Sequence, residues 1–439
     1  MSGEGLAYPD RVAIEPLQNP PRASLRVPGS KSITNRALVL AALASRGGEC
    51  RLSGVLRSED TEVMVAALGE LGYRVRPDWN AASIRVLPLE SAFVVPAREA
   101  NLFVANSGTT MRFLTAIVAL GSGKYRLDGI ARMRERPLDD LLSALQQLGV
   151  EATSERGNGC PPVLVRANGL RGGEVTIRGD VSSQFLSGLL MAAPYASATL
   201  RITIDGPLVS RPYVDMTAKM MRQFGADVET DGEKYIVRAP STYRARSYDI
   251  EADASSASYF WAAAAITGGR VKVEGVSSTG IQGDVEFARV LGKMGCRVLD
   301  GDSEITVAGD RLQGIDVDMN DISDTVMTLA AVACFAEGST TIRNVAHIRH
   351  KETDRLAALA TELRRVGAGV DEFADGLTIT PRPMHGAEIE TYNDHRMAMS
   401  LALVGLRVPG IVIKNPGCVA KTYPGFFNDL DRLRHANGG

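Results

Sequence analysis

The chain has 439 residues, of which 45% are hydrophobic and 23% are charged, a length that exceeds one ordinary hydrophobic core and predicts two domains. Its 49 Lys and Arg residues nearly balance its 51 Asp and Glu residues, so the net charge of −2 gives no global attraction to nucleic acid or anionic lipid. No uninterrupted apolar run is longer than eight residues, whereas a membrane-spanning helix needs roughly 20.

A repeat of about 72 residues organises the chain. In each copy the pattern Leu/Met-x-x-Leu/Phe/Val-Gly is followed by an extended stretch. This pattern predicts an amphipathic surface helix that ends at a glycine and leads into a strand. The glycines, in chain order, are Gly72, Gly149, Gly225, Gly295 and Gly367.

A second series of segments runs in step with the first. Its six copies are residues 30–43, 107–117, 182–191, 255–264, 323–331 and 393–402. Each copy begins with small hydroxyl-bearing or acidic residues and continues as almost entirely apolar sequence, which is typical of a helix buried on every side. Short alternating Val and Ile runs between them, such as 271–274 and 340–343, predict strands. We therefore expect an α/β protein of six units, three in each of two domains, with a boundary near residues 239–244.

Polar side chains gather where the buried helices begin. Helix N-termini attract anions because their backbone N–H groups are unpaired and the helix dipole is positive there. N-capping alone would explain the serines and threonines equally well, but it does not explain the Lys, Arg and Gln beside them. The residues in question are Lys31, Ser32, Arg36, Gly108, Thr109, Arg112, Ser182, Ser183, Gln184, His395 and Arg396.

The loops before the surface helices carry a second set of cations, at residues 132–137, 210–213, 350–355 and 420–424. Cations on separate loops suit a ligand with two or more anionic groups. For 351–355 alone, a solvated and charge-balanced helix start is an equally good interpretation. Asp324 could be a helix cap or a general base, and Glu352 could be an ion-pair partner or a proton carrier.

Several common cofactor motifs are missing. The segment around Lys31 lacks the first glycine of a phosphate-binding P-loop, and no G-x-G-x-x-G follows a predicted strand. His347 and His350 lack a third ligand at metal-site spacing, so we expect no metal. The five cysteines are scattered without a C-x-x-C pair, and residues 1–10 lack a targeting signal, which favours a reducing cytoplasm.

Seven motifs resemble, in order, those of the 5-enolpyruvylshikimate-3-phosphate synthase family of the shikimate pathway, over about residues 24–427. They are residues 28–36, 106–112, 132–137, 182–186, 253–260, 351–355 and 392–396. The resemblance implies the two-domain enolpyruvyl transferase fold, an inside-out α/β barrel with six βαβαββ repeats, three per domain. It implies one domain of residues 1–28 plus 245–439, another of residues 29–244, crossovers near 27–29 and 244–251, and an active site in the interdomain cleft.

The implied reaction transfers the enolpyruvyl group of phosphoenolpyruvate to the 5-hydroxyl of shikimate 3-phosphate and releases phosphate through a tetrahedral intermediate. It is a step of aromatic amino acid biosynthesis that needs no metal or organic cofactor. Asp324 resembles the base towards the 5-hydroxyl, and Glu352, with Lys31 nearby, the proton carrier at the vinyl carbon. The implied shikimate 3-phosphate ligands are Lys31, Ser32, Arg36, Ser182, Ser183, Gln184, Ser210, Tyr213, Asp324, His347 and Lys351. The implied phosphoenolpyruvate ligands are Lys31, Gly108, Arg132, Gln184, Arg355, Arg396 and Lys421.

Two positions depart from the family pattern. His347 stands where well-known members carry an Asn that touches shikimate 3-phosphate, and Phe113 follows Arg112 where many members have Pro. Gly108 and residues 182–186 resemble the class that glyphosate inhibits, so we expect inhibition by this compound.

Three alternatives remain. A sister enolpyruvyl transferase acts on UDP-N-acetylglucosamine, but it carries a reactive Cys in the loop matching residues 130–137, where this chain has none. The balanced charge argues against an RNA-end-processing relative. A non-catalytic anion-binding scaffold would not need both Asp324 and Glu352 beside paired cations. We expect a monomer with no nucleic acid or membrane partner.

Overall fold

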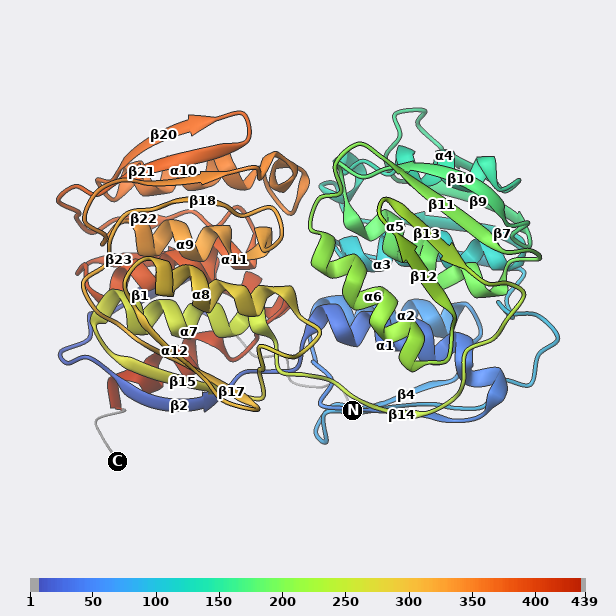
Figure 1. The fold of residues 1–439 in the computed structure, drawn as a ribbon, viewed down its shortest axis with the longest axis horizontal. Coiled ribbons are helices and arrows are strands. Elements are labelled where there is room, and N and C mark those ends of the chain that lie inside the picture. Colours follow the sequence, from blue (N-terminus) through green and yellow to red (C-terminus); the bar gives the residue numbers. More distant parts are fainter. Residues whose placement is uncertain (1–7, 436–439) are drawn as a thin grey trace. The chain divides into compact units, whose positions relative to one another are not determined.

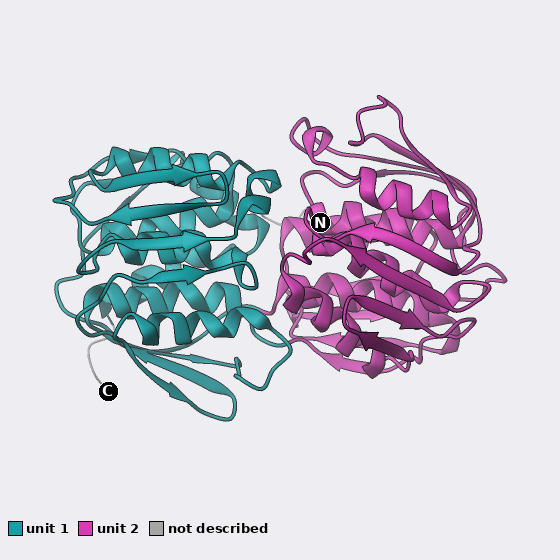
Figure 2. Ribbon diagram, turned by 45° about the horizontal axis from the view of Figure 1, so that its top comes forward, with its two compact units in different colours: residues 1–28, 251–439 teal, residues 29–250 magenta. Residues whose placement is uncertain are grey.

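The computed structural model describes residues 8–435, which form two compact units (Figures 1 and 2). Unit 1 comprises the chain up to Pro28 and from Glu251 onwards, and unit 2 comprises Gly29–Ile250. No helix in the described part of the chain is both long and apolar enough to cross a membrane.

Unit 2 contains three four-stranded sheets. In each sheet the two strands at one end are parallel, and the other two pair antiparallel. The first sheet has the order β14(Ser247–Asp249), β3(Cys50–Ser53), β5(Ser83–Val86), β4(Val75–Asp78). The second has β6(Glu99–Phe103), β7(Ser122–Asp128), β9(Val163–Asn168), β8(Glu151–Ser154). The third has β10(Gly173–Arg178), β11(Leu200–Asp205), β13(Lys234–Val237), β12(Val228–Asp231).

Unit 1 repeats this arrangement in two sheets and shortens it in a third. The first has the order β16(Arg297–Asp300), β17(Glu304–Ala308), β15(Arg270–Glu274), β2(Arg22–Arg26). The second has β18(Asp316–Asp318), β19(Thr340–Arg343), β21(Gly376–Thr380), β20(Gly369–Phe373). The third has three strands, β1(Arg11–Ile14), β23(Ile411–Lys414), β22(Glu388–Ile389), in which β1 supplies the antiparallel partner.

Two sets of helices accompany these sheets. The helices that follow the first strand of each repeat are α1(Lys31–Ala44), α3(Gly108–Ile117), α5(Ser183–Ala192), α7(Ala254–Thr267), α9(Val326–Ala333) and α11(His395–Ala402). The helices that follow the second strand are α2(Glu59–Glu70), α4(Asp139–Gln147), α6(Arg211–Gln223), α8(Glu286–Lys293), α10(Arg355–Arg365) and α12(Phe426–His435). Short 3₁₀ turns are η1(Ser45–Gly47), η2(Val118–Leu120), η3(Met133–Glu135), η4(Ala193–Tyr195), η5(Gly283–Val285), η6(Ser323–Thr325), η7(Ala346–His350), η8(Leu403–Leu406) and η9(Pro416–Lys421).

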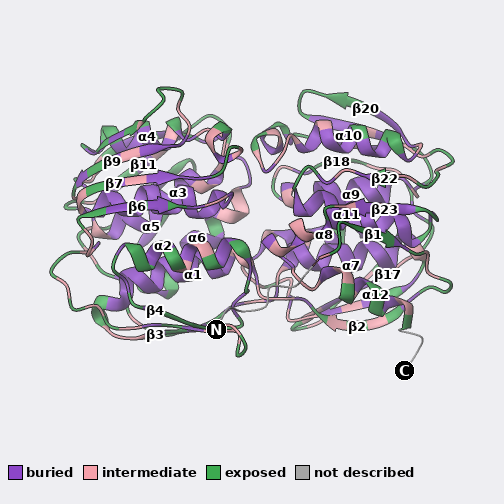
Figure 3. Cartoon of the chain, turned by 180° about the vertical axis from the view of Figure 1, so that it is seen from behind, coloured by how far each residue is buried: buried purple, intermediate pink, exposed green. Residues whose placement is uncertain are grey.

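The first set of helices forms the core of each unit, as their apolar sequences predict. Every residue of α3 is buried, and in α7 every residue from Ala254 to Ile266 is buried. Figure 3 shows the same helices almost entirely in the colour of buried residues, while the strands alternate between buried and exposed positions. Such alternation is typical of a sheet with one face on the core and one in water.

The glycines of the repeat all have positive φ angles. The values range from 80° at Gly149 to 112° at Gly295, and each glycine lies just after a surface helix and before a strand. A residue with a side chain adopts this conformation only at a cost, so glycine ends the helix most cheaply. The prediction of glycine-terminated surface helices is confirmed.

Two strands are exchanged between the chain segments of the two units. β2 precedes α1 in the chain but pairs in parallel with β15 of unit 1, and Figure 1 shows the blue β2 beside the yellow β15. β14 precedes α7 but pairs in parallel with β3 of unit 2. The chain therefore changes unit after Pro28 and after Ile250, whereas the sequence analysis placed the second boundary after residue 244.

Helices α3 and α5 pack so closely that Gly188 has no room for a side chain. A Cβ atom there would lie 3.0 Å from the carbonyl oxygen of Arg112 and 3.4 Å from Cβ of Ala116. We expect Gly188→Ala to lower the free energy of unfolding by about 1–3 kcal/mol, because α3 backbone atoms would have to move. The urea midpoint of the purified variant measures this effect.

Gly69 in α2 is the matched control. It is exposed, and a Cβ atom there would meet nothing within 4 Å. Gly69→Ala should therefore stabilise the protein by up to about 1 kcal/mol through helix propensity alone. Equal responses of the two variants would contradict the packing argument.

Candidate active site

Arg355, the first residue of α10, lies at the centre of a buried group of charges in unit 1. Its guanidinium donates to three carboxylates: NH1 to Asp324 Oδ1 (3.2 Å), NH2 to Glu352 Oε2 (2.9 Å) and Nε to Asp394 Oδ2 (2.8 Å). The side chain is only 1% exposed. Burial alone would lower the pKa of Arg355, but the three carboxylates raise it above its ordinary value. The group is therefore a permanent, fixed cation.

Three further cations surround the same carboxylates. Arg396 NH2 donates to Asp324 Oδ2 at 2.7 Å, Lys351 Nζ lies 3.9 Å from Asp324 Oδ1, and Lys421 Nζ lies 4.0 Å from Glu352 Oε1. We call this set the unit 1 charge cluster: Asp324, Lys351, Glu352, Arg355, Asp394, Arg396 and Lys421. Four cations and three carboxylates leave one positive charge in excess, which favours an anionic ligand.

Two neutral polar groups lie beside the cluster. The hydroxyl of Tyr259 accepts a hydrogen bond from Arg396 NH1 (3.4 Å), and burial raises the pKa of Tyr259 to about 12. Burial, reinforced by the charge of Lys351, lowers the pKa of His347 to about 3. His347 therefore presents a neutral imidazole at pH 7, which can donate and accept hydrogen bonds as an amide can.

Unit 2 holds a buried cation in different surroundings. Arg36 in α1 donates to the hydroxyl of Thr217 (2.7 Å) and to the carbonyl oxygens of Ser32 (3.0 Å) and Tyr213 (3.1 Å). Its guanidinium carbon lies 5.1 Å from the ring centre of Phe113 and 5.9 Å from that of Tyr213. No carboxylate pairs with Arg36 among the residues that the structure describes, and burial lowers its pKa to about 10. An anionic ligand would offset the cost of burying this charge.

Lys31 begins α1 and makes a buried ion pair. Its Nζ lies 3.2 Å from Oδ2 of Asp60, which belongs to the first turn of α2. The carboxylate of Asp60 is 2% exposed and the Lys31 side chain is 14% exposed. The ammonium group is therefore the accessible member of the pair.

Gly108 begins α3 beneath two arginines. A Cβ atom at this position would lie 2.6 Å from Arg136 NH2 and 2.8 Å from Arg112 NH1. Arg112 NH1 donates to the carbonyl of Gly108, and Arg136 NH1 to that of Asn106, each at 3.3 Å. The helix N-terminus is thus combined with two guanidinium groups, an arrangement suited to an anion.

The start of α5 lies beside the start of α3. The hydroxyl of Ser182 caps the helix by accepting from the backbone N–H of Gln184 (3.3 Å). Gln184 Nε2 in turn donates to the hydroxyl of Thr109 (3.2 Å). Ser183, the first residue of α5, is buried. The first turns of two core helices are therefore joined through their side chains.

Two remaining predicted residues lie on loops of unit 2. Ser210 immediately precedes α6, is buried and has a φ angle of 51°, an uncommon conformation for a residue with a side chain. Arg132 precedes η3, and its NH1 donates to Glu135 Oε2 at 3.0 Å.

The structure gathers the predicted residues within each unit. Unit 1 holds Asp324, His347, Lys351, Glu352, Arg355, Arg396 and Lys421. Unit 2 holds Lys31, Ser32, Arg36, Gly108, Arg132, Ser182, Ser183, Gln184, Ser210 and Tyr213. Among the described residues, no group of three or more His, Cys, Asp or Glu side chains could hold a metal ion.

Three buried charged residues that contact the predicted ones were not predicted from the sequence. Asp60 pairs with Lys31, Arg136 lies over Gly108, and Asp394 pairs with Arg355. Arg136 and Asp394 lie inside the motifs at 132–137 and 392–396, so both could have been proposed as site residues from the sequence. Asp60 lies outside every motif, and only the fold brings it to Lys31.

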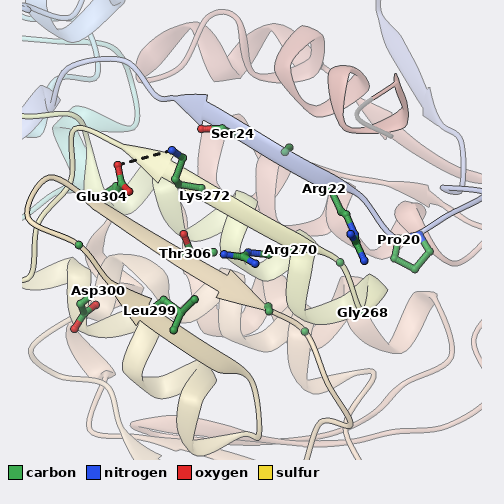
Figure 4. Close-up of a pocket in the computed structure, with 15 residues that line it drawn as sticks. Pro20, Arg22, Ser24, Gly268, Arg270, Lys272, Leu299, Asp300, Glu304 and Thr306 are labelled. Carbon is green, nitrogen blue, oxygen red and sulfur yellow. Dashed lines mark ion pairs between the residues drawn. The ribbon is translucent and has the colours of Figure 1, made fainter. Parts of the chain in front are cut away.

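A separate hollow lies on the sheet of β2, β15, β17 and β16 (Figure 4). Its charges are mixed: Lys272 Nζ lies 3.8 Å from Glu304 Oε2. None of the residues that line it belongs to the seven motifs that resemble the family.

The buried His347 should make stability depend on pH. Its pKa falls from 6.5 to about 3 on folding, so between these values the unfolded chain binds more protons. The unfolding free energy is therefore not reduced by His347 above pH 6.5, and it falls as the pH is lowered from 6.5 towards 3. We expect the unfolding free energy of His347→Asn to fall less steeply over this range, by up to about 1.4 kcal/mol per pH unit.

Urea titrations at several pH values measure this slope. His385, which is exposed, receives the same substitution as the control and should leave the slope unchanged. Identical slopes for the wild type and His347→Asn would contradict the burial argument.

Comparisons with known proteins agree with the family resemblance. The EPSP synthase (3-phosphoshikimate 1-carboxyvinyltransferase) family matches residues 17–430. A 3-phosphoshikimate 1-carboxyvinyltransferase of Trichormus variabilis is 49% identical over 426 residues, which cover 97% of this chain and 99% of the relative. Its counterpart in Thiobacillus denitrificans is 50% identical over 412 residues, covering 92% and 95%.

A solved structure of EPSP synthase from Acinetobacter baumannii superposes with a TM-score of 0.80 at 27% identity, covering 96% of this chain and 98% of that one. The six-repeat α/β fold is therefore the enolpyruvyl transferase fold that the motifs implied. Because the family match and the relatives extend over nearly all of its length, the chain belongs to the EPSP synthase family, the 3-phosphoshikimate 1-carboxyvinyltransferases of aromatic amino acid biosynthesis.

Proposed function

We propose that this chain transfers the enolpyruvyl group of phosphoenolpyruvate to the 5-hydroxyl of shikimate 3-phosphate. The observation that carries the proposal is the unit 1 charge cluster, in which four cations surround two carboxylates suited to proton transfer. Both substrates are multiply charged anions, and fixed cations offset their mutual repulsion.

Asp324 is the proposed base towards the 5-hydroxyl. Both of its oxygens accept from arginines, Oδ1 from Arg355 and Oδ2 from Arg396, which fixes the plane of the carboxylate. Its side chain is 17% exposed, more than that of Glu352 or Arg355, so a substrate hydroxyl can reach it. A carboxylate oxygen has two lone pairs and can therefore accept a second hydrogen bond.

Glu352 is the proposed proton carrier at the vinyl carbon, with Lys31 assisting. Protonation of the methylene carbon of phosphoenolpyruvate and attack of the 5-oxygen on the adjacent carbon give the tetrahedral intermediate. Loss of a proton from the new methyl group and departure of phosphate then restore the double bond. The hydrogen bond from Arg355 to Oε2 fixes the position of the Glu352 carboxylate. Its other oxygen, Oε1, lies 4.0 Å from Lys421 Nζ and is the more weakly bound of the two.

The remaining residues divide between the two substrates. For phosphoenolpyruvate we assign Lys31, the backbone N–H of Gly108, Arg132, Gln184, Arg355, Arg396 and Lys421. For shikimate 3-phosphate we assign Lys31, Ser32, Arg36, Ser182, Ser183, Gln184, Ser210, Tyr213, Asp324, His347 and Lys351. Arg36 supports the second assignment because it is a buried cation whose described partners are neutral. The neutral His347 can take over the hydrogen bonds of the family's Asn.

One variant in each unit tests the proposal. Asp324→Asn should lower kcat by about a hundredfold or more, because the amide cannot accept the hydroxyl proton. Arg36→Gln should raise KM for shikimate 3-phosphate while leaving KM for phosphoenolpyruvate nearly unchanged. Phosphate release with both substrates and no added metal is the assay.

A change of the substrate that accepts the enolpyruvyl group provides the control. UDP-N-acetylglucosamine in place of shikimate 3-phosphate should give no release. Release with the UDP-sugar only would overturn the acceptor assignment, and no release with either acceptor would favour an anion-binding scaffold.

We also propose that glyphosate inhibits the enzyme. The start of α3 at Gly108, with Arg112 and Arg136 around it, offers charges that suit a small dianion. Phosphate release should fall with increasing glyphosate, and added phosphoenolpyruvate should restore it. Unchanged activity at concentrations that saturate sensitive members would contradict the proposal.

The proposed enzyme is a monomer of the cytoplasm. All five cysteines are free, and Cys50, Cys296 and Cys334 are buried, which suits a reducing compartment.

A further inference from the structure

Asp394 holds two of the proposed anion-binding arginines with one carboxylate. Its Oδ2 accepts from Arg355 Nε (2.8 Å), and its Oδ1 accepts from Arg355 NH2 (3.3 Å) and from the backbone N–H of Arg396 (2.9 Å). Asp394 is 0% exposed and is the N-cap of α11. It therefore acts on the side chain of one arginine and on the backbone of the other.

The turn before Asp394 is strained and firmly anchored. Tyr392 and Asn393 have φ angles of 53° and 54°, in the left-handed region that residues with side chains seldom adopt. Glu362 of α10 accepts from the Tyr392 hydroxyl (2.8 Å) and from the backbone N–H of Glu390 (3.1 Å). Such strain persists only where the surroundings enforce it, and it is common at functional sites.

Helix α10 thus meets the start of α11 at two places. Its first residue, Arg355, pairs with Asp394, and Glu362, two turns later, holds the preceding turn. The pairing with Asp394 fixes the plane of the Arg355 guanidinium, since Nε and NH2 both donate to its carboxylate. The hydrogen bond from the backbone N–H of Arg396 to Asp394 fixes the position of Arg396 in the first turn of α11.

We propose that Asp394 is a positioning residue that aims Arg355 and Arg396 at phosphoenolpyruvate. This inference rests on the proposed function. Both carboxylate oxygens of Asp394 already accept from Arg355 or Arg396, and a carboxylate has no proton to donate to an anionic substrate. Without its carboxylate, Arg355 would keep only Asp324 and Glu352 as acidic partners, and its guanidinium would be free to turn towards the proposed base.

The test is Asp394→Asn. Asparagine has the same size and one oxygen that can cap α11, but it lacks the negative charge and the second of the two oxygens that accept from Arg355. We expect KM for phosphoenolpyruvate to rise about tenfold or more, as for the loss of a charged hydrogen bond. KM for shikimate 3-phosphate should change less than about twofold. Steady-state phosphate release with each substrate varied in turn measures both constants.

Glu362→Gln is the matched control. Glu362 is another fully buried carboxylate with several hydrogen-bond donors, and it contacts neither arginine of the cluster. A purely structural role for Asp394 would make both variants less stable to urea and leave both KM values unchanged. That result, or an equal rise of both KM values in Asp394→Asn, would overturn the inference.

The wild-type assay distinguishes failure of the proposed function from failure of the positioning role. A wild-type chain that releases no phosphate contradicts the proposed function, whereas an active wild type with an unaltered KM in Asp394→Asn contradicts only the positioning role. If Asp394→Asn does not fold, Asp394→Ser takes its place, because serine retains a capping oxygen but cannot pair with Arg355. It should show the same selective rise of KM.

Discussion

A helix buried along its whole length can present polar groups only at its ends, and this constraint determines where the chemistry of the molecule lies. The six core helices are buried along nearly their whole length, and most of their residues beyond the first turns are apolar. Their first turns are where unpaired backbone N–H groups and charged side chains can gather. The same sequence feature that builds the core therefore also fixes where the proposed ligands Lys31, Gly108, Gln184 and Arg396 lie, near the starts of core helices.

The free-energy cost of burying an arginine is offset in different ways in the two units. Arg355 in unit 1 is compensated by three carboxylates contributed by three different segments, whereas the described partners of Arg36 in unit 2 are neutral oxygens and aromatic rings. A compensated arginine is held rigidly and is ready to orient a ligand. An uncompensated one gains more when an anion arrives, since the ligand then supplies the missing charge. The two proposed ligand arginines thus differ in how much of their charge the protein itself already balances.

The sequence predicts those parts of the fold that depend on local pattern. Glycine-terminated helices, the six almost entirely apolar helices and the strands between them are predicted from neighbouring residues, and the structure contains them. The exchange of β2 and β14 depends on pairing between residues 248 and 196 positions apart in the chain (270 − 22 and 247 − 51). Local sequence pattern does not indicate such pairing, and only the family resemblance implied it. Asp60 and Asp394 could not be assigned roles, because a capping residue and an ion-pair partner look alike until the fold shows what lies opposite. The low pKa of His347 likewise follows from burial, which its sequence neighbours do not reveal.

The proposed base, Asp324, and phosphoenolpyruvate are assigned the same hydrogen-bond donors. Arg355 and Arg396 both donate to Asp324, and the same two guanidinium groups are assigned to phosphoenolpyruvate. Each guanidinium has a fixed set of N–H groups, so an anion that takes one of them competes with Asp324. Because Nε and NH2 of Arg355 donate to Asp394, this competition at Arg355 concerns NH1, the group that donates to Asp324. Binding of phosphoenolpyruvate would then weaken the hold on Asp324 without releasing Arg355, and a carboxylate with fewer strong donors is a better proton acceptor. On the proposed assignments, phosphoenolpyruvate therefore acts on the surroundings of the proposed base as well as on its own ligands.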